Sequence, residues 1–283
     1  MRPLSALPDE DARRLEGLLF DLDDTLLTRG RLEEAAYASL FALARAGLRL
    51  IAVTGRPSGW GALLARQWPI DGVVTENGPI AVIREGEHVT RLDRCGAEER
   101  RARRVRLGRL VERMRDVVPE ARLTDDVDAR VSDVTWDIGE RVHLPADRIA
   151  ALQAEVRAFG ARTSRSSVHV HATYDVEDKA SGAVGFLRER FGVDPGRALS
   201  RYAYVGDSGN DAPCFAAFHT TFGVANVTAA LAQLAVPPRY VTEATRGQGV
   251  RGARGGAVPS ARALTHAQRA AGRGWGMRAG GSE

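Results

Sequence analysis

The chain has 283 residues, of which 44% are hydrophobic and 27% charged, and these proportions predict a soluble globular protein of one large or two modest domains. It contains no apolar run near the ~20 residues of a membrane span. Its two cysteines, Cys95 and Cys214, have the spacing of neither a disulfide framework nor a metal site. Because Asp9, Glu10 and Asp11 leave no signal-peptide core, we expect a cytoplasmic protein that does not bind membranes.

The net charge of +4 is concentrated towards the C-terminus. Residues 246–283 contain seven arginines and one acidic side chain, and the rest of the chain carries 33 basic and 35 acidic residues. Because this region is rich in Gly, Ala and Arg and has no apolar periodicity, we predict that residues 251–283 form a disordered tail. Its Arg-Gly pieces would attract nucleic acid without sequence preference, but the scarcity of aromatic residues argues against nucleic acid as a partner.

The first apolar strand, predicted over residues 17–22, ends in clustered carboxylates. Asp21 and Asp23 are two residues apart and therefore share one side of the chain, whereas Asp24 suits the cap of the following turn. Carboxylates at the end of a buried strand need a compensating cation or ligand. Ligands of open α/β sheets bind at these carboxyl ends.

A second strand, predicted over residues 48–53, ends in Thr54, Gly55 and Arg56. A hydroxyl and free backbone N–H groups at such a turn can hold a phosphate. These three residues are therefore candidates for binding a phosphorylated substrate.

Lys179 is the only lysine in a chain with 40 Lys and Arg residues. Its compact point charge suits a phosphate, where arginine would present a planar fork. Further on, the strand predicted over residues 202–206 ends in Asp207 and Asp211. Two acidic strand ends far apart in the sequence predict a hard divalent cation, and Mg²⁺ prefers carboxylates, water and phosphate oxygens.

In this order, the four motifs resemble those of the haloacid dehalogenase-like superfamily of phosphohydrolases. DLDDTLL resembles the first motif, Thr54 the second, Lys179 the third and GDSGND the fourth, and the resemblance spans residues 18–250. The turn Thr75–Pro79 is similar to the Glu-Asn-Gly turn of the type IIB (Cof-like) subgroup, which inserts a cap between the second and third motifs. The long interval between those motifs agrees with such a cap.

Apolar periodicity and the resemblance together predict the architecture. Strands alternate with helices, which indicates an α/β fold: a Rossmann-like doubly wound parallel sheet core with an inserted α+β cap domain. The predicted divisions are core residues 1–90, a C2-type cap over 91–172 and further core residues 173–250. The remaining predicted elements are core strands at 72–75, 220–224 and 239–242, helices at 32–46, 59–67, 180–191, 212–217 and 229–235, a hairpin at 79–90, and cap elements at 98–118 (helix), 129–138 (strand), 145–159 (helix) and 163–172 (strand).

The last predicted cap strand carries polar side chains. Ser167, His169 and His171 alternate with valines and therefore share one face of that strand. With Arg165, the two histidines are candidates for binding sugar hydroxyls or a second anionic group of a substrate. The alternative is an exposed polar sheet face without a binding role.

The resemblance implies a phosphoric monoester hydrolase that works through an aspartyl-phosphate. Asp21 would be the nucleophile, and Asp23 would protonate the leaving oxygen and then deprotonate water. Thr54 and Lys179 would stabilise the transferring phosphoryl group.

The resemblance also implies the remaining ligands. Mg²⁺ would be held by Asp21, by the backbone carbonyl of Asp23, by Asp207, and by Asp211 directly or through water. Two asparagines complete the candidate substrate-binding residues, namely Asn77 and Asn210.

We expect the substrate to be a small phosphate ester, in particular a sugar phosphate of the kind cleaved by mannosyl-3-phosphoglycerate phosphatases. Two alternatives stay open at this point. A phosphomutase similar to phosphomannomutases also uses paired aspartates, and a non-catalytic protein would use the Arg-Gly tail on nucleic acid. The sequence gives no information on oligomeric state.

Overall fold

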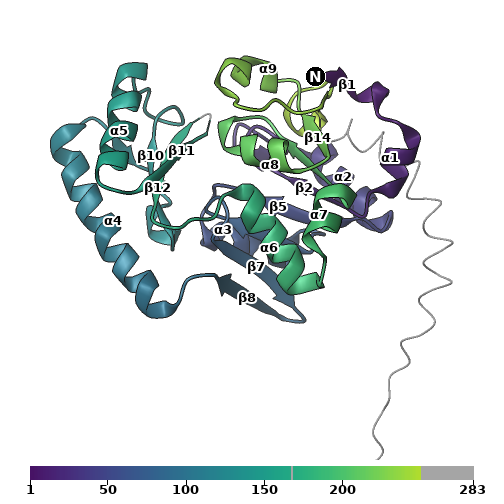
Figure 1. Ribbon diagram of the computed structural model, residues 1–283, viewed down its shortest axis with the longest axis horizontal. Coiled ribbons are helices and arrows are strands. Elements are labelled where there is room, and N and C mark those ends of the chain that lie inside the picture. The colour runs from purple at the N-terminus through teal and green to yellow at the C-terminus, as the bar shows by residue number, and fades with distance from the viewer. Residues whose placement is uncertain (167, 250–283) are drawn as a thin grey trace, which may run out of the picture.

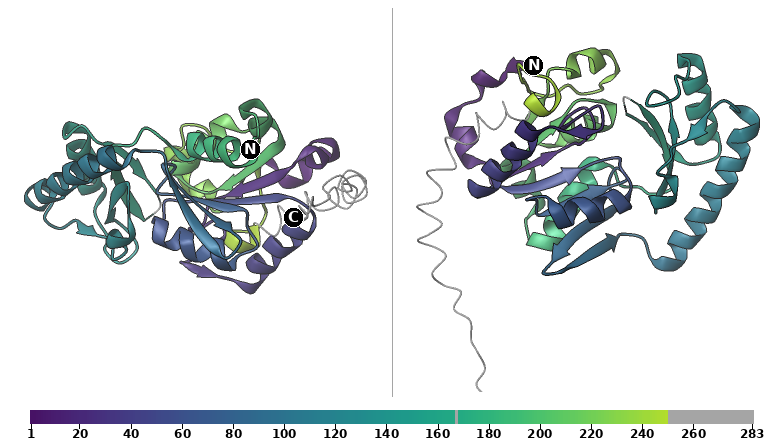
Figure 2. Two further views of the ribbon diagram at one scale, coloured as in Figure 1. Left: turned by 90° about the horizontal axis from the view of Figure 1, so that it is seen from below. Right: turned by 180° about the vertical axis from the view of Figure 1, so that it is seen from behind.

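The computed structural model describes residues 1–166 and 168–249, which form two lobes (Figures 1 and 2). One lobe is a nine-stranded sheet with helices on both faces, and the other is a four-stranded sheet backed by two helices. The predicted fold class, an α/β core with an inserted α+β cap, is confirmed. The tail predicted over residues 251–283 lies outside the described residues.

The strands of the core sheet are parallel from one edge as far as β6 and antiparallel beyond it. The hairpin predicted over 79–90 is present, and it extends this sheet before the chain enters the cap. In order across the sheet, the strands are β1 (Arg2–Pro3), β15 (Tyr240–Val241), β14 (Thr220–Gly223), β13 (Tyr202–Gly206), β2 (Gly17–Phe20), β5 (Arg49–Val53), β6 (Gly72–Thr75), β7 (Ile80–Glu85) and β8 (His88–Asp93).

Helices cover both faces of this sheet because its strands are apolar on both sides. Leu18 and Phe20 of β2 pack in one core cluster, whereas Leu19 between them packs in the other. The first cluster includes α2 (Glu34–Arg45) and α3 (Ser58–Gln67), and the second includes α6 (Lys179–Phe191), α7 (Pro195–Arg201) and α8 (Ala212–Ala217). Smaller elements are α1 (Asp9–Arg14), α9 (Val227–Ala230), and the short hairpin of β3 (Leu27–Thr28) and β4 (Arg31–Leu32).

The cap sheet is antiparallel and has one apolar and one polar face. Its strands follow the order β11 (Arg162–Arg165), β12 (His169–Thr173), β10 (Asp133–Asp137) and β9 (Arg122–Leu123). Trp136 and Val170 pack against α4 (Ala97–Val117) and α5 (Ala146–Ala158), which lie on the side away from the core (Figure 1). The polar face is therefore turned towards the core.

Three predicted elements differ from the structure. The single strand predicted over 163–172 is wrong, because the chain reverses there and β11 pairs antiparallel with β12. The strand predicted over 129–138 begins only at Asp133, after a 3₁₀ turn. The helix predicted over 229–235 is instead α9 followed by a 3₁₀ turn. In each case the sequence pattern fitted one continuous strand or helix, and the turn that shortens or interrupts the element was not predicted.

Within the part of the chain that the structure describes, no helix combines the length and the apolar character needed to cross a bilayer. The cytoplasmic location stays a prediction.

Candidate active site

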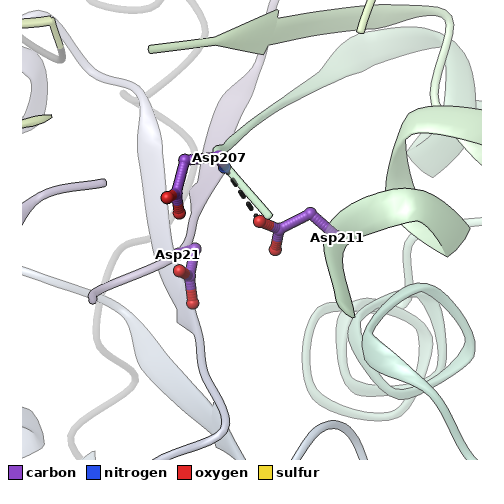
Figure 3. Close-up of side chains that lie close together, drawn as sticks. All are labelled: Asp21, Asp207 and Asp211. Carbon is purple, nitrogen blue, oxygen red and sulfur yellow. Dashed lines mark hydrogen bonds between the residues drawn. The ribbon is translucent and has the colours of Figure 1, made fainter. Parts of the chain in front are cut away.

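Three aspartates converge at the carboxyl ends of β2 and β13, two neighbouring parallel strands. Asp21 follows β2, Asp207 follows β13, and Asp211 lies one turn further on. One carboxylate oxygen from each lies within 4.8 Å of the others (Figure 3). The sequence prediction that the two acidic strand ends meet is therefore confirmed.

Lys179 joins this cluster from the first turn of α6. Its Nζ lies 2.7 Å from Oδ1 of Asp21 and 2.7 Å from Oδ1 of Asp211, and its side chain is completely buried. Burial opposes the charge on Lys179, but the two aspartates outweigh it and raise the lysine pKa. Lys179 is therefore a fixed cation in the site.

The position of Lys179 depends on the turn that follows β6. Asp178 caps α6, accepting from the backbone N–H of Ser181. Gly78 has φ +137°, and a Cβ there would lie 2.4 Å from the carbonyl oxygen of Asp178. A Cβ on Gly182 would lie 2.4 Å from Cα of Gly78. Only glycines allow the helix and the turn to pack this closely.

The charge of the cluster suits a divalent cation. Burial, together with Asp211 and Asp23, raises the pKa of Asp21 to about 7, and burial with Asp211 and Asp21 raises that of Asp207 well above its ordinary range. Three carboxylates share one ammonium group, so two negative charges stay unbalanced when all are ionised. Hard oxygen donors with this excess charge fit Mg²⁺.

The hydrogen bonds differ among the three aspartates. Both oxygens of Asp211 are occupied, one by Lys179 and Tyr204 and the other by the backbone N–H groups of Asp207 and Ser208. Asp211 therefore orders the loop after β13, which favours a water-mediated role towards a metal over a direct one.

Two residues that the sequence analysis missed support Asp207. Thr25 Oγ1 donates to Oδ1 of Asp207 over 2.9 Å, and Asn226 Nδ2 donates to Oδ2 over 2.9 Å. Asn226 follows β14 at the same sheet edge, so extending the strand-end argument to β14 would have made it a candidate. Thr25 lies inside the first motif, but only the fold shows that its hydroxyl reaches Asp207.

Thr54 is buried at the end of β5, and its hydroxyl accepts from the backbone N–H of Arg56 over 3.0 Å. Its carbonyl accepts from the N–H of Asn77 over 3.0 Å. Asn77 in turn accepts from Asn210 over 3.1 Å. The structure thus brings the second motif, the Glu-Asn-Gly turn and the fourth motif together.

The Arg56 side chain lies against Asp23. Its Nε and Nη2 are 2.9 and 2.7 Å from the two carboxylate oxygens of Asp23. The guanidinium also lies over the ring of Trp60 and within 3.6–3.8 Å of two cap carboxylates, Glu140 and Asp126. The burial cost to Arg56 is outweighed by Asp23, so its pKa is raised.

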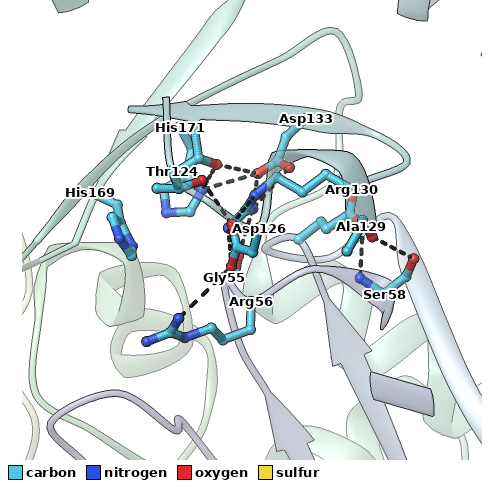
Figure 4. A network of polar contacts seen from close by, with 12 residues as sticks. Gly55, Arg56, Ser58, Thr124, Asp126, Ala129, Arg130, Asp133, His169 and His171 are labelled. Carbon is cyan, nitrogen blue, oxygen red and sulfur yellow. Dashed lines mark hydrogen bonds and ion pairs between the residues drawn. The ribbon is translucent and has the colours of Figure 1, made fainter. Parts of the chain in front are cut away.

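On the cap, His171 is held by Asp133. Its Nδ1 lies 3.0 Å from Asp133 Oδ2 (Figure 4). The same atom lies 3.1 Å from Thr135 Oγ1. Burial lowers the pKa of His171 to about 4 despite Asp133, so the ring is neutral near pH 7. With Nδ1 donating to the carboxylate, Nε2 is an acceptor. Nε2 lies close to the loop after β5, because a Cβ added to Gly55 would be 3.2 Å from it.

The other candidate cap residues lie in two different places. His169 Nε2 is 2.8 Å from Glu140 on the core-facing side. Arg165 pairs across the sheet with Val170, which packs on the apolar face, so the structure separates Arg165 from the two histidines. Arg165 lines a cleft of about 600 Å³ that also reaches Asp207.

Glu76 connects the two lobes, a role that the sequence analysis missed. It follows β6 with φ +54°, and its buried carboxylate accepts from the backbone N–H of Ser58, Val131 and Ser132 and from the Ser132 hydroxyl. Arg130 adds a bond from the cap to the carbonyl of Gly55 over 3.0 Å. The sequence showed a tight turn here but gave no sign of its partner.

Comparisons with known proteins give the fold. No protein-family model matches the sequence, and no curated protein matches it significantly. Solved structures do match. A Thermoplasma acidophilum protein has a TM-score of 0.65 and 18% identity, covering 90% of this chain and 98% of that one. A sucrose-phosphatase from Synechocystis, solved with sucrose and phosphate, has a TM-score of 0.59 and 16% identity over 89% of this chain and 98% of its own.

A sugar phosphatase of subclass IIB in the haloacid dehalogenase superfamily also matches, with a TM-score of 0.54 and 18% identity over 89% of this chain and 99% of its own. The chain has the haloacid dehalogenase-like fold. The similarity includes the cap as well as the core, because these matches cover nearly all of each solved chain and about nine-tenths of this one. At such low identities the haloacid dehalogenase-like fold is what the similarity shows, and the chemistry has to be argued from the residues.

Proposed function

We propose that the protein is a Mg²⁺-dependent phosphatase that hydrolyses a small phosphate ester, a sugar phosphate, through an aspartyl-phosphate. One observation carries the proposal: a buried lysine lies 2.7 Å from the candidate nucleophile Asp21, within a cluster of three strand-end aspartates. An acidic cluster alone fits many roles. A fixed cation beside one carboxylate and a second carboxylate two residues on fit phosphoryl transfer.

The first half of the reaction transfers the phosphoryl group to the protein. An Asp21 oxygen forms a bond to phosphorus, and the bond from phosphorus to the leaving oxygen breaks. Asp23 gives its proton to that oxygen, and the alcohol leaves. Lys179 and the Thr54 hydroxyl balance charge on the phosphoryl oxygens.

The second half restores Asp21. The Asp23 carboxylate, held at both oxygens by Arg56, takes a proton from water while the water oxygen attacks phosphorus. The bond between Asp21 and phosphorus breaks, and inorganic phosphate leaves. Asp23 then holds the proton that the next leaving oxygen requires, which balances the cycle.

Asp21, Asp207 and the Asp23 carbonyl would hold Mg²⁺, with Asp211 acting through water. When bound, the ion supplies positive charge that lowers repulsion between the nucleophilic carboxylate and the phosphate. The residues fit this ion because a divalent cation would balance the two excess negative charges of the buried cluster.

The cap supports a small substrate. The polar face of its sheet is turned towards the core lobe (Figure 1), and the cleft that reaches Asp207 has a volume of about 600 Å³, which is the size of a metabolite site. The similar Synechocystis protein is a sucrose-phosphatase solved with sucrose and phosphate, and a second match is a sugar phosphatase. A sugar phosphate is therefore the substrate class that we propose.

The test is phosphate release from a panel of sugar phosphates with Mg²⁺, with EDTA and Asp21→Asn as controls. We expect release that requires both the metal and Asp21. Release that persists in Asp21→Asn would overturn the assignment of the nucleophile. An isomerised sugar phosphate without free phosphate, detected by mass-resolved chromatography or NMR, would instead identify a phosphomutase.

A further inference from the structure

The cleft between the lobes has a different chemistry at each end. On the core side it is lined by Asp207, Ser208 and Asn226, next to the aspartate cluster. On the cap side it is lined by Gln153 of α5 and Arg165 at the end of β11. A substrate whose phosphate lies at the aspartates would extend its leaving group along this cleft towards the cap.

Within residues 1–166 and 168–249, Arg165 differs from the other cations around the site, because its guanidinium makes no hydrogen bond or ion pair there. The residue is half-buried. Each of the other cations has at least one carboxylate partner: Lys179, Arg56, Arg130 and Arg246. A half-buried guanidinium without a counter-ion is a ready site for an anion.

The position of Arg165 is fixed by the backbone around it. Its strand pairs with β12 up to Val170, and its carbonyl oxygen approaches Gly209, where an added Cβ would lie 3.3 Å away. The end of β11 therefore packs against the loop that carries Asp207. The backbone of Arg165 is therefore at the lobe boundary, and the residue lines the cleft from there.

We infer that Arg165 binds a second anionic group, a carboxylate or a further phosphate, on the leaving group of the substrate. This inference rests on the proposed function and narrows its substrate class to phosphate monoesters whose alcohol portion is itself negatively charged. Ser166 is a supporting donor, because its Oγ accepts from the N–H of His169 over 3.1 Å and its own proton is left to donate. The planar fork of Arg165 would bind two oxygens of either anion.

The experiment uses pairs of substrates that differ in one anionic group. Glycerol 3-phosphate and 3-phosphoglycerate differ by a carboxylate, and fructose 6-phosphate and fructose 1,6-bisphosphate differ by a phosphate. Calorimetry measures their binding to full-length Asp21→Asn protein with Mg²⁺, and kcat/KM is measured with the unmodified chain. Arg165→Gln is compared with Arg101→Gln, which removes an exposed arginine of α4 on the outer side of the cap.

In at least one pair, we expect the member with the additional anionic group to bind about 10- to 100-fold more tightly than the member without it. This is the range for a hydrogen bond to a charged group. Arg165→Gln should remove that preference, Arg165→Lys should retain part of it, and Arg101→Gln should retain it fully. The pair that shows the preference identifies carboxylate or phosphate. Equal binding within both pairs, or a preference that survives Arg165→Gln, would overturn the inference.

The two proposals fail in different ways. Selective binding that is lost in Arg165→Gln, without any phosphate release, would support the anion site and contradict the phosphatase. Metal-dependent phosphate release without selectivity for the anionic member would support the phosphatase and contradict the anion site.

Discussion

Arg56 binds both carboxylate oxygens of Asp23, with Nε 2.9 Å from Oδ2 and Nη2 2.7 Å from Oδ1. The same guanidinium lies 3.6 Å from Glu140 on the cap, and Glu140 is 2.8 Å from His169. Hydrogen bonding from His169 and the charge of Arg56 lower the pKa of Glu140 to about 2. The orientation of the proposed acid and base is therefore tied to the position of the cap.

Replacing Arg56 should slow the reaction more than it weakens binding. Arg56→Gln removes the fork that orients Asp23, and misplacing a catalytic group costs on the order of 10²-fold in rate. We expect kcat to fall by about that factor while KM changes by less. Arg56→Lys keeps the charge but not the two-point contact, so its kcat should lie between those of the unmodified chain and Arg56→Gln. Arg45→Gln, an exposed arginine on α2, is the matched control. A larger effect on KM than on kcat would contradict the positioning role.

Thr25 should control metal affinity without touching the substrate. Thr25→Val preserves shape but removes the 2.9 Å hydrogen bond to Asp207. Losing such an outer-shell partner costs about 10- to 100-fold in metal affinity. The Mg²⁺ concentration for half-maximal activity should rise accordingly, and Thr28→Val on the neighbouring hairpin should leave it unchanged. An unchanged Mg²⁺ requirement in Thr25→Val would show that Asp207 is not a metal ligand.

Mg²⁺ binding should weaken below neutral pH. The pKa of Asp21 in the metal-free protein is about 7, raised by burial and by Asp211 and Asp23. A metal binds the ionised form, so protons compete with it below that pKa, and affinity should fall by up to about tenfold per pH unit. Calorimetric titrations at pH 6, 7 and 8 measure this effect. Constant affinity over that range would mean that Asp21 is ionised throughout.

Sequence reasoning found the parts of this site that lie at strand ends. Asp21, Thr54 and Asp207 each follow an apolar run, and the parallel sheet brings all such ends to one edge. It did not find Thr25 or Asn226, because a supporting role depends on which side chain the fold brings within hydrogen-bonding distance.

The cap was less predictable for the same physical reason. Alternation of residues 163–172 suggested one strand, but a polar run around Ser166 turns the chain, and the register between β11 and β12 then fixes each face. Arg165 therefore lies on a different face from His171. The bonds of Glu76 to Ser132 join segments far apart in the sequence, and no local pattern records such a contact.

His171 should make stability depend on pH in a defined window. Its folded-state pKa is about 4, lowered by burial, whereas an unfolded histidine titrates near 6.5. Between these values the unfolded chain binds the extra proton on this side chain, so the contribution of His171 to the free energy of unfolding falls as pH drops from about 6.5 to about 4, by at most about 3 kcal/mol. The pKa of Asp133 is about 2, because Arg130 and His171 outweigh its burial, so its contribution is lost mainly below about pH 4, at and beyond the lower end of this window.

Urea unfolding at several pH values tests the role of His171. In His171→Asn, which keeps a polar group facing Asp133, the slope of stability against pH between pH 4 and 6.5 should be lower than in the unmodified chain. His143→Asn removes an exposed histidine of the same lobe and should keep the slope of the unmodified chain. If both variants keep that slope, His171 is not the group that titrates, and its hydrogen bond to Asp133 must hold a charged ring instead.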